Sequence, residues 1–192
     1  MPNLKGTKTE KNLLAAFAGE SQARNRYTFF ASAARKAGLE GIAGIFQETA
    51  DNEKEHAKVY FQHLQGGMVE LTASYPAGVI GDTLVNLKAA AAGEHEEWTA
   101  LYPRAAEVAS QEGFPEVATS FEQIAKVENW HERRYNQLAE RLAKGEVFKR
   151  AGKIRWKCRN CGYVSEGLEA PATCPACKHP QAYHEPWTDQ NY

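Results

Sequence analysis

The sequence lacks a surplus of either charge, since 23 Lys and Arg residues stand against 24 Asp and Glu residues in a chain of 192 residues. Such a chain has no basic field for nucleic acid or for an anionic membrane surface, so we expect neither partner. Runs of about 18 apolar residues, which a membrane span requires, are absent too. The opening residues, MPNLKGTKTEKNLL, have no apolar core or small-residue cleavage site of a secretory signal. These absences favour a cytoplasmic protein.

Cysteine is also scarce, and all four cysteines lie between residues 158 and 177. They form two Cys-x2-Cys pairs, Cys158 with Cys161 and Cys174 with Cys177. In a reducing compartment, two tight pairs predict four thiolate ligands of one metal ion rather than disulfides. The spacing alone leaves zinc and iron open, because both ions accept four thiolates in a tetrahedron.

Helical periodicity predicts four long helices upstream of the cysteines, over about residues 7–38, 40–66, 81–112 and 115–145. The first begins at a capping box formed by Thr7 and Glu10, and the fourth begins at Pro115, a residue suited to a first helical turn. Pro103 lies within the third helix and predicts a kink, because proline removes a backbone hydrogen bond. Only the connection between the second and third helices is long, so these two can run parallel, as in ferritin-like bundles with one crossover.

The predicted fold is therefore mainly α: a ferritin-like four-helix bundle with one long crossover, followed by a small metal-knuckle domain. The bundle is expected over residues 1–146, a charged linker over 147–153 and the small domain over 154–192. A domain of about forty residues buries little apolar surface, so we expect it to depend on its metal for folding.

The predicted inward-facing stripe of every helix contains an acid: Glu20, Glu53, Glu94 and Glu128. The same stripes place Arg24 in the first helix, and Leu101 and Val108 in the third, toward the interior. Ionised Glu is almost never buried without a partner, and removing it from water costs several kcal/mol. Four buried acids therefore predict a strongly positive centre between the helices.

An internal repeat relates the two halves of the bundle. Ala18-Gly19-Glu20 recurs as Ala92-Gly93-Glu94, and a Glu-x2-His follows each, first Glu53 with His56 and then Glu128 with His131. Within Glu-x2-His the carboxylate and the imidazole share one helix face and can converge on one ion. One Glu and one Glu-x2-His, present twice, form the ligand pattern of ferritin-like di-iron and di-manganese proteins. Oxygen and nitrogen ligands without thiolate favour these metals over softer ones.

Glu97 breaks this repeat, because it lies three positions after Glu94 whereas the first half has Ala23 at the matching offset. We expect it to add a fifth carboxylate to the site, the alternative being a solvated surface acid. Tyr27 and Tyr102 lie one or two helical turns from the terminal acids, where their hydroxyls either orient ligand carboxylates or bond to other acceptors in the core.

Two further histidines, His63 and His95, have no ligand-like spacing. We expect both to be ordinary helix residues.

With both sites in view, the sequence resembles the rubrerythrin family over essentially its whole length. The motifs that carry the resemblance are AGESQARNRY (18–27), ETADNEKEHA (48–57), AAGEHEEWTALYP (91–103), VENWHERR (127–134) and the two cysteine pairs. The resemblance implies a di-iron bundle joined to a rubredoxin-like domain with one iron held by four cysteines, for which zinc can substitute. It also implies a peroxidase that reduces hydrogen peroxide to water in defence against oxidative stress.

The resemblance divides the ligands between the two irons. Glu53 and Glu128 would bridge them, while Glu94 and His131 would bind one iron terminally and Glu20 would bind the other.

A change of ligand is implied as well. The iron bound by Glu20 would exchange Glu97 for His56 on reduction, which gives the residue that breaks the repeat a part in the reaction.

Electron supply and assembly follow from the same resemblance. The cysteine-bound iron would pass electrons to the di-iron site, and its own reductant would be a rubredoxin or an NAD(P)H-dependent flavin reductase. The family also implies a homodimer in which the cysteine-bound iron of one chain serves the di-iron site of its partner.

Two other functions remain open from the residues alone. The first is a ferroxidase that oxidises and sequesters iron, as ferritin does, although storage needs no dedicated electron inlet. The second is a non-catalytic module in which zinc folds the small domain and the bundle mediates assembly.

Overall fold

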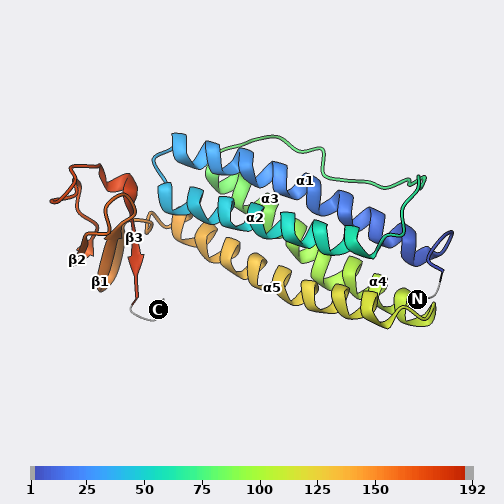
Figure 1. Cartoon of the computed structure of the whole chain (residues 1–192). Coiled ribbons are helices and arrows are strands. Elements are labelled where there is room, and N and C mark those ends of the chain that lie inside the picture. Colours follow the sequence, from blue (N-terminus) through green and yellow to red (C-terminus); the bar gives the residue numbers. More distant parts are fainter. Residues whose placement is uncertain (1–2, 189–192) are drawn as a thin grey trace.

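The computed structural model describes residues 3–188 and contains a helical bundle with a small β domain at one end (Figure 1). The bundle consists of α1 (Lys8–Lys36), α2 (Glu40–His63), α3 (Thr83–Glu96), the π-helical turn η1 (Glu97–Leu101), α4 (Tyr102–Gln111) and α5 (Pro115–Ala143). Figure 1 shows α2 and the α3–α4 segment running in the same direction, joined by a long crossover along the bundle. The predicted ferritin-like bundle with one crossover is confirmed.

Local capping explains where the first and third helices begin. At the start of α1, the Thr7 hydroxyl oxygen accepts a hydrogen bond from the Glu10 backbone N–H at 3.0 Å, as the capping box predicts. At the start of α3, an Asp82 carboxylate oxygen accepts one from the Val85 N–H at 2.8 Å. Gly38 follows α1 with a φ of 75°, a left-handed conformation that suits glycine and ends the helix.

The predicted third helix contains a π-helical turn at Glu97–Leu101, where the Tyr102 N–H donates to the Glu97 carbonyl. The wider turn inserts one residue and rotates every later side chain relative to a regular helix. Tyr102 is therefore buried and Leu101 is 47% exposed, whereas the uninterrupted period predicted Leu101 inside. Val108, also predicted inside, is only partly buried.

Two apolar clusters lie along the bundle axis on either side of the buried acids. One contains Phe46 and Tyr135, and the other contains Leu13 and Phe121. Arg24, predicted to face inward, is exposed, because Ala23 occupies the interior position on that turn of α1.

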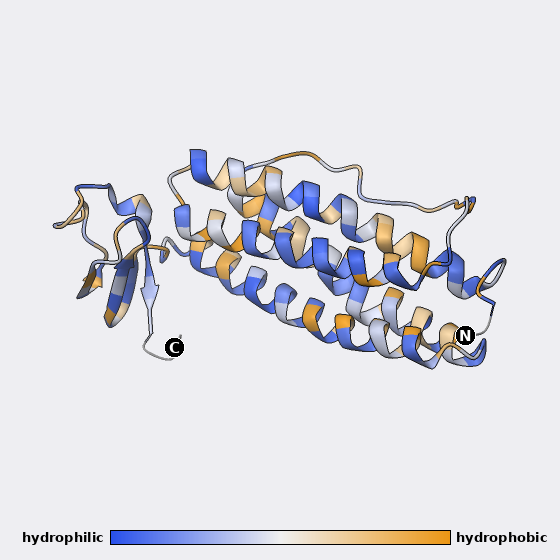
Figure 2. Ribbon diagram, in the orientation of Figure 1, coloured by the Kyte–Doolittle hydropathy of each residue, from blue (hydrophilic) through white to orange (hydrophobic). Residues whose placement is uncertain are grey.

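Polar and apolar residues alternate along every bundle helix in Figure 2, as expected for helices with one face in water. Among residues 3–188, no helix has the length and apolar character needed to cross a bilayer.

The small domain is a three-stranded antiparallel sheet with the order β2-β1-β3. Its strands are β1 (Lys149–Cys158), β2 (Val164–Glu169) and β3 (His184–Trp187), with a short 3-10 turn, η2 (Gln181–Tyr183), before β3. The pairing of β1 with β2 is irregular between Lys149 and Ile154 and regular from there to Lys157. Trp156 is fully buried in this domain, and its indole N–H donates to the Gly167 carbonyl at 3.1 Å.

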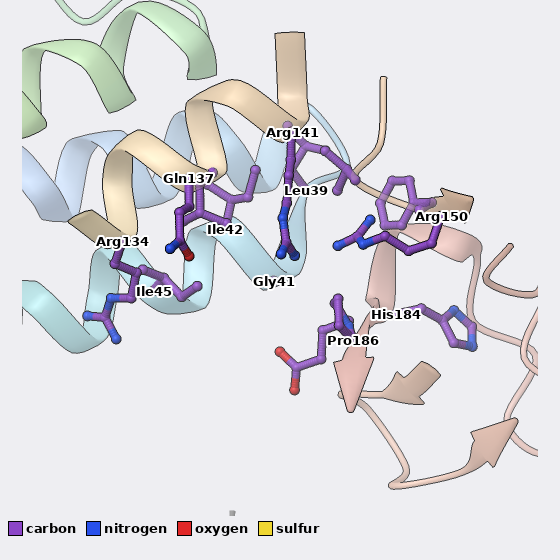
Figure 3. A pocket seen from close by; sticks show the side chains of 14 residues that line it. Leu39, Gly41, Ile42, Ile45, Arg134, Gln137, Arg141, Arg150, His184 and Pro186 are labelled. Carbon is purple, nitrogen blue, oxygen red and sulfur yellow. The ribbon is translucent and has the colours of Figure 1, made fainter. Parts of the chain in front are cut away.

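The small domain lies against the end of the bundle where α2 begins. The Arg159 side chain lies directly over Gly44 of α2, and Glu185 packs beside Gly41. A cleft of about 250 Å³ remains between the two parts, with Ile42 of α2, Arg141 of α5 and Pro186 of β3 around it (Figure 3). The two domains therefore touch directly rather than only through the connecting chain.

Candidate metal centres

The bundle brings the predicted acids and histidines into two overlapping groups, each able to surround one ion. One group is Glu20, Glu53, His56 and Glu128, and the other is Glu53, Glu94, Glu128 and His131. Glu53 of α2 and Glu128 of α5 belong to both groups, so the arrangement follows the twofold pattern of the sequence repeat. The four acids are at most 1% exposed, so they form a core of charge inside an apolar bundle.

The shared acids stand between the two imidazoles. His56 Nδ1 lies 2.9 Å from a Glu53 oxygen and 2.9 Å from a Glu128 oxygen. His131 Nδ1 lies 2.8 Å from the other Glu128 oxygen and 3.3 Å from the other Glu53 oxygen. Each shared carboxylate thus offers one oxygen to each side of the site.

The unshared acids occupy equivalent outer positions. Glu20 lies 3.8 Å from His56 Nδ1, and Glu94 lies 3.8 Å from His131 Nδ1. The two imidazole rings are stacked, with centroids 6.0 Å apart.

These groups are close together without being hydrogen-bonded to one another. Both oxygens of Glu53 and of Glu128, and Nδ1 of His56 and of His131, are buried with no hydrogen-bond partner among the described residues. Two ligands about 2.1 Å from an ion and at right angles to each other lie about 3 Å apart, which matches the shortest of these separations. The residues therefore fit a pair of metal ions, because the ligand atoms of each group lie within 4.8 Å of one another and the shared acids have no hydrogen-bond partner among the described residues.

The electrostatics of the cluster also require added positive charge. Burial, together with the neighbouring Glu53 carboxylate, raises the pKa of Glu94 to about 8. Burial and the nearby Glu128 and Glu53 carboxylates raise the pKa of Glu20 well above its ordinary value. Although burial opposes the charged imidazole, the neighbouring Glu128 and Glu53 carboxylates raise the pKa of His56 to about 9. Protons or metal cations must therefore neutralise the site.

Glu97 lies at the edge of this cluster and belongs to neither metal-holding group among the described residues. It is the first residue of the π turn, and its carboxyl is partly buried. Burial and the Glu94 carboxylate raise its pKa well above the ordinary range, so Glu97 interacts electrostatically with the acids of the cluster. The sequence predicted Glu97 as a fifth carboxylate of the site. In the structure His56 lies in the same metal-holding group as Glu20, and Glu97 lies outside both groups.

The two predicted tyrosines contact the outer acids. The Tyr27 hydroxyl donates to Glu94 at 2.5 Å, and the Tyr102 hydroxyl donates to Glu20 at 2.5 Å. The sequence left open whether they orient these carboxylates or bond elsewhere, and the structure shows the carboxylate contact. Each hydroxyl satisfies one oxygen of its Glu and leaves the other buried without a hydrogen-bond partner among the described residues.

A second pair of tyrosines was not singled out from the sequence. Tyr60 packs edge-on against Tyr102, and Tyr135 packs edge-on against Tyr27, both with ring centroids 5.6 Å apart. A signal existed, because Glu53-x2-His56 continues to Tyr60 and Glu128-x2-His131 continues to Tyr135, both four positions after the histidine. The repeat thus extends one helical turn beyond the ligands.

The histidines expected to be ordinary lie outside the cluster. His63 Nε2 is 2.9 Å from the Ser120 hydroxyl, and His95 Nδ1 is 3.2 Å from Glu132.

The four cysteines converge at one end of the small domain, as predicted. Cys158 Sγ lies 3.7 Å from Cys177 Sγ, and Cys161 Sγ lies 3.7 Å from Cys174 Sγ. Four sulfurs each about 2.3 Å from a central ion lie about 3.8 Å apart in a tetrahedron, so the spacing fits one metal and is far too long for disulfides.

A backbone group favours the thiolate form of Cys177. The backbone N–H of His179 is the main cause that lowers the pKa of Cys177 to about 5. Gly162 has a φ of 79°, as the tight turn after Cys161 requires, and its N–H donates to the Cys158 carbonyl at 2.8 Å. The contact with the His179 N–H therefore stabilises negative charge on Cys177, the form that binds a metal, whereas burial raises the pKa of Cys158.

Comparison with known proteins covers both sites. A sequence model described as Rubrerythrin matches residues 11–139, and one described as Rubrerythrin, rubredoxin-like domain matches residues 156–185. A rubrerythrin of Porphyromonas gingivalis is 64% identical over 96% of this chain and 92% of that protein. A rubrerythrin of Nitratidesulfovibrio vulgaris is 54% identical over 96% of this chain and 97% of its own length. A structure titled as the partially reduced state of nigerythrin superposes with a TM-score of 0.61 at 28% identity, covering 96% of this chain and 91% of that one.

Proposed function

The chain belongs to the rubrerythrin family, and on that premise we propose that it is a cytoplasmic peroxidase that reduces hydrogen peroxide to water in defence against oxidative stress. The observation that carries the proposal is the presence of two different candidate metal sites in one chain. One offers carboxylates and imidazoles, which suit a pair of iron ions, and the other offers four thiolates, which suit a single iron.

The proposed ligands are the residues that the bundle brings together. Glu53 and Glu128 would be shared between the two irons, Glu20 and His56 would complete one side, and Glu94 and His131 would complete the other. Two ferrous ions bound there would supply the two electrons that peroxide reduction consumes.

The surrounding residues would hold the ligands and the protons in place. Tyr102 and Tyr27 donate hydrogen bonds that fix the outer carboxylates, and so limit their movement when the charge of the site changes. Glu97, whose pKa is raised by burial and by the Glu94 carboxylate, would take the place of His56 when the site is oxidised. The grouping of His56 with Glu20 corresponds to the ligand set proposed for the reduced state.

We propose that Cys158, Cys161, Cys174 and Cys177 hold an iron that returns electrons to the bundle one at a time. A rubredoxin or an NAD(P)H-dependent flavin reductase would reduce this iron. In the proposed homodimer it would serve the di-iron site of the second copy.

The test is peroxide consumption by anaerobically purified, iron-loaded protein with NADH, a flavin reductase and rubredoxin. We expect NADH oxidation that depends on peroxide, on rubredoxin and on the protein. Iron retained per chain is measured in the same preparation after aerobic addition of excess ferrous salt. Absence of peroxide-dependent turnover, together with iron retained far beyond the three proposed sites, would support the ferroxidase instead.

A further inference from the structure

A hollow of about 280 Å³ lies between α1, the α3–η1–α4 segment and the crossover. Its outer rim includes Ser74, Tyr75 and Pro76 of the crossover, and its inner wall includes Tyr27, Glu97 and Tyr102. The hollow therefore extends from the surface of the bundle to residues that contact the candidate di-iron site.

Two glycines keep this hollow open. Gly19 and Gly93 both line it, and each immediately precedes an outer acid of the repeat, Glu20 or Glu94. Neither has a positive φ, and a Cβ built on Gly93 meets nothing within 4 Å. Glycine inside a helix costs about 0.5–1 kcal/mol relative to alanine, and here neither backbone conformation nor crowding requires it. What the two glycines provide is empty space beside the acids.

Tyr75 partly covers the mouth of the hollow. Its hydroxyl donates to the Ala15 carbonyl of α1 at 2.9 Å, and its ring edge lies 3.7 Å from the position that a Cβ of Gly19 would take. Residues 72–80 are otherwise exposed, so this part of the crossover has little buried surface to hold it down. Segments with few buried contacts open at low free-energy cost.

We propose that peroxide reaches the candidate di-iron site through this hollow, and that Tyr75, Gly19 and Gly93 set the size of the peroxide that enters. The walls between rim and acids include Ala16 and Ala23, whose small side chains leave room for a small molecule beside the acids. This inference rests on the proposed function and names the entrance and size preference of the same site.

The first test narrows the passage with Gly93→Leu and uses Ala92→Leu as the matched control, since Ala92 is exposed and is not part of the lining. Azide serves as a small linear probe whose binding to oxidised, iron-loaded protein is followed by its absorption band in stopped flow. We expect Gly93→Leu to slow azide binding by about tenfold or more, equivalent to about 1.4 kcal/mol of barrier, and Ala92→Leu to leave it unchanged. Gly93→Ala should act in the same direction, more weakly, and covers the case in which Gly93→Leu fails to fold or to load iron.

The second test widens the mouth with Tyr75→Ala and uses Met68→Ala, an exposed position on the same crossover, as the control. We expect Tyr75→Ala to raise kcat/KM for tert-butyl hydroperoxide relative to hydrogen peroxide by about tenfold. Tyr75→Phe, which keeps the ring and loses the hydrogen bond to Ala15, should give a smaller increase.

The outcomes separate this inference from the proposed function. Equal azide rates in wild-type protein and in the folded, iron-loaded Gly93 variants would overturn the route, whether or not peroxide is turned over. An unchanged peroxide ratio in Tyr75→Ala would remove Tyr75 from size selection. Failure of the wild-type protein to consume any peroxide would contradict the proposed function, while the azide rates would still decide the route.

Discussion

At the scale of single residues, Glu53 and Glu128 are the least replaceable members of the cluster, because each faces both imidazoles. Their positions were predictable, since an ionised acid is rarely buried in the inward stripe of a helix unless a cation neutralises it. The position of Glu97 outside both metal-holding groups was not predictable from spacing. A helix period says which face a residue occupies, but not whether Glu97 or His56 joins the group around Glu20. Loss of Glu97 is therefore more informative than loss of a shared acid.

We expect Glu97→Ala to keep its full complement of bundle metal, because Glu97 is absent from both metal-holding groups of the described residues. Peroxide turnover should fall by about 10–100-fold, the range typical for residues that support metal ligands. Metal analysis and steady-state kinetics on the same sample check both parts. Unchanged turnover would remove Glu97 from the proposed reaction.

Metal binding by the bundle is expected to release protons at pH 7. In the absence of metal, His131 with a pKa of about 12, His56 at about 9 and Glu94 at about 8 all hold protons at that pH. Metal ions bind the deprotonated forms, so apparent affinity should rise between pH 6 and 9. Titration calorimetry with ferrous ion in two buffers of different ionisation enthalpy measures the release. Equal heats in both buffers would contradict the expectation.

The same pKa shifts determine whether the stability of the metal-free protein rises or falls with pH. Stabilisation from the raised histidine pKa values is complete below pH 6.5, and the His56 share is lost as pH rises through about 9. Glu94, whose pKa is also raised, becomes destabilising as pH rises from 4.5 to about 8. Metal-free protein should therefore melt at a lower temperature at pH 9 than at pH 6.5, and metal should narrow that difference.

At the scale of secondary structure, the π turn at Glu97–Leu101 explains why the residues predicted to face inward in the third helix differ from those that are buried. The regular period held through Glu94, so the acids and the repeat were recoverable from the sequence. Beyond Glu97 the inserted residue moves Tyr102 to the interior in place of Leu101. A proline at position 103 signalled an irregularity but not its form, since a kink and a π turn both accommodate a missing N–H.

The α4–α5 connection secures the start of α1 through Glu112. Its carboxylate accepts hydrogen bonds from the Thr9 N–H at 2.8 Å and from the Thr9 hydroxyl at 2.6 Å. These bonds, foremost that from the hydroxyl, lower the pKa of Glu112. The ionised carboxylate therefore stabilises the folded protein above pH 4.5, and this contribution is lost as the pH falls through the pKa of Glu112 in the folded state.

Glu112→Gln should lower Tm by about 2–4 °C at pH 7, which corresponds to about 1 kcal/mol at a helix N-terminus. The difference from wild type should shrink below pH 4.5. Melting curves at pH 4 and pH 7 measure this, with Glu107→Gln as the exposed control on α4. A difference that is the same at both pH values would show that charge at Glu112 is not the cause.

At the scale of the whole molecule, the cysteine spacing and the helical repeat together were enough to predict a bundle joined to a small metal-binding domain. The contact between the two parts was not predictable, because it depends on space that glycine leaves. Arg159 lies over Gly44 of α2, and the helical period gives no sign that this glycine contacts another domain.

The proposed division of labour between domains gives a distinct prediction for Cys161→Ala. Removing one thiolate should abolish rubredoxin-driven peroxide reduction, because the remaining three sulfurs no longer complete the tetrahedral site. A small chemical reductant should still support turnover, since the bundle residues are untouched. Equal loss of activity with both electron sources would contradict the relay.

Metal content tests the central claim most directly, namely that the buried acids of the bundle hold paired cations. Iron and zinc per chain are measured in protein purified anaerobically from its native source, beside Glu128→Ala and Cys161→Ala variants produced in the same way. We expect about three irons per chain in the wild type, loss of about two in Glu128→Ala and loss of about one in Cys161→Ala. A wild-type protein without iron, or a Glu128→Ala variant that retains all three irons, would contradict the account.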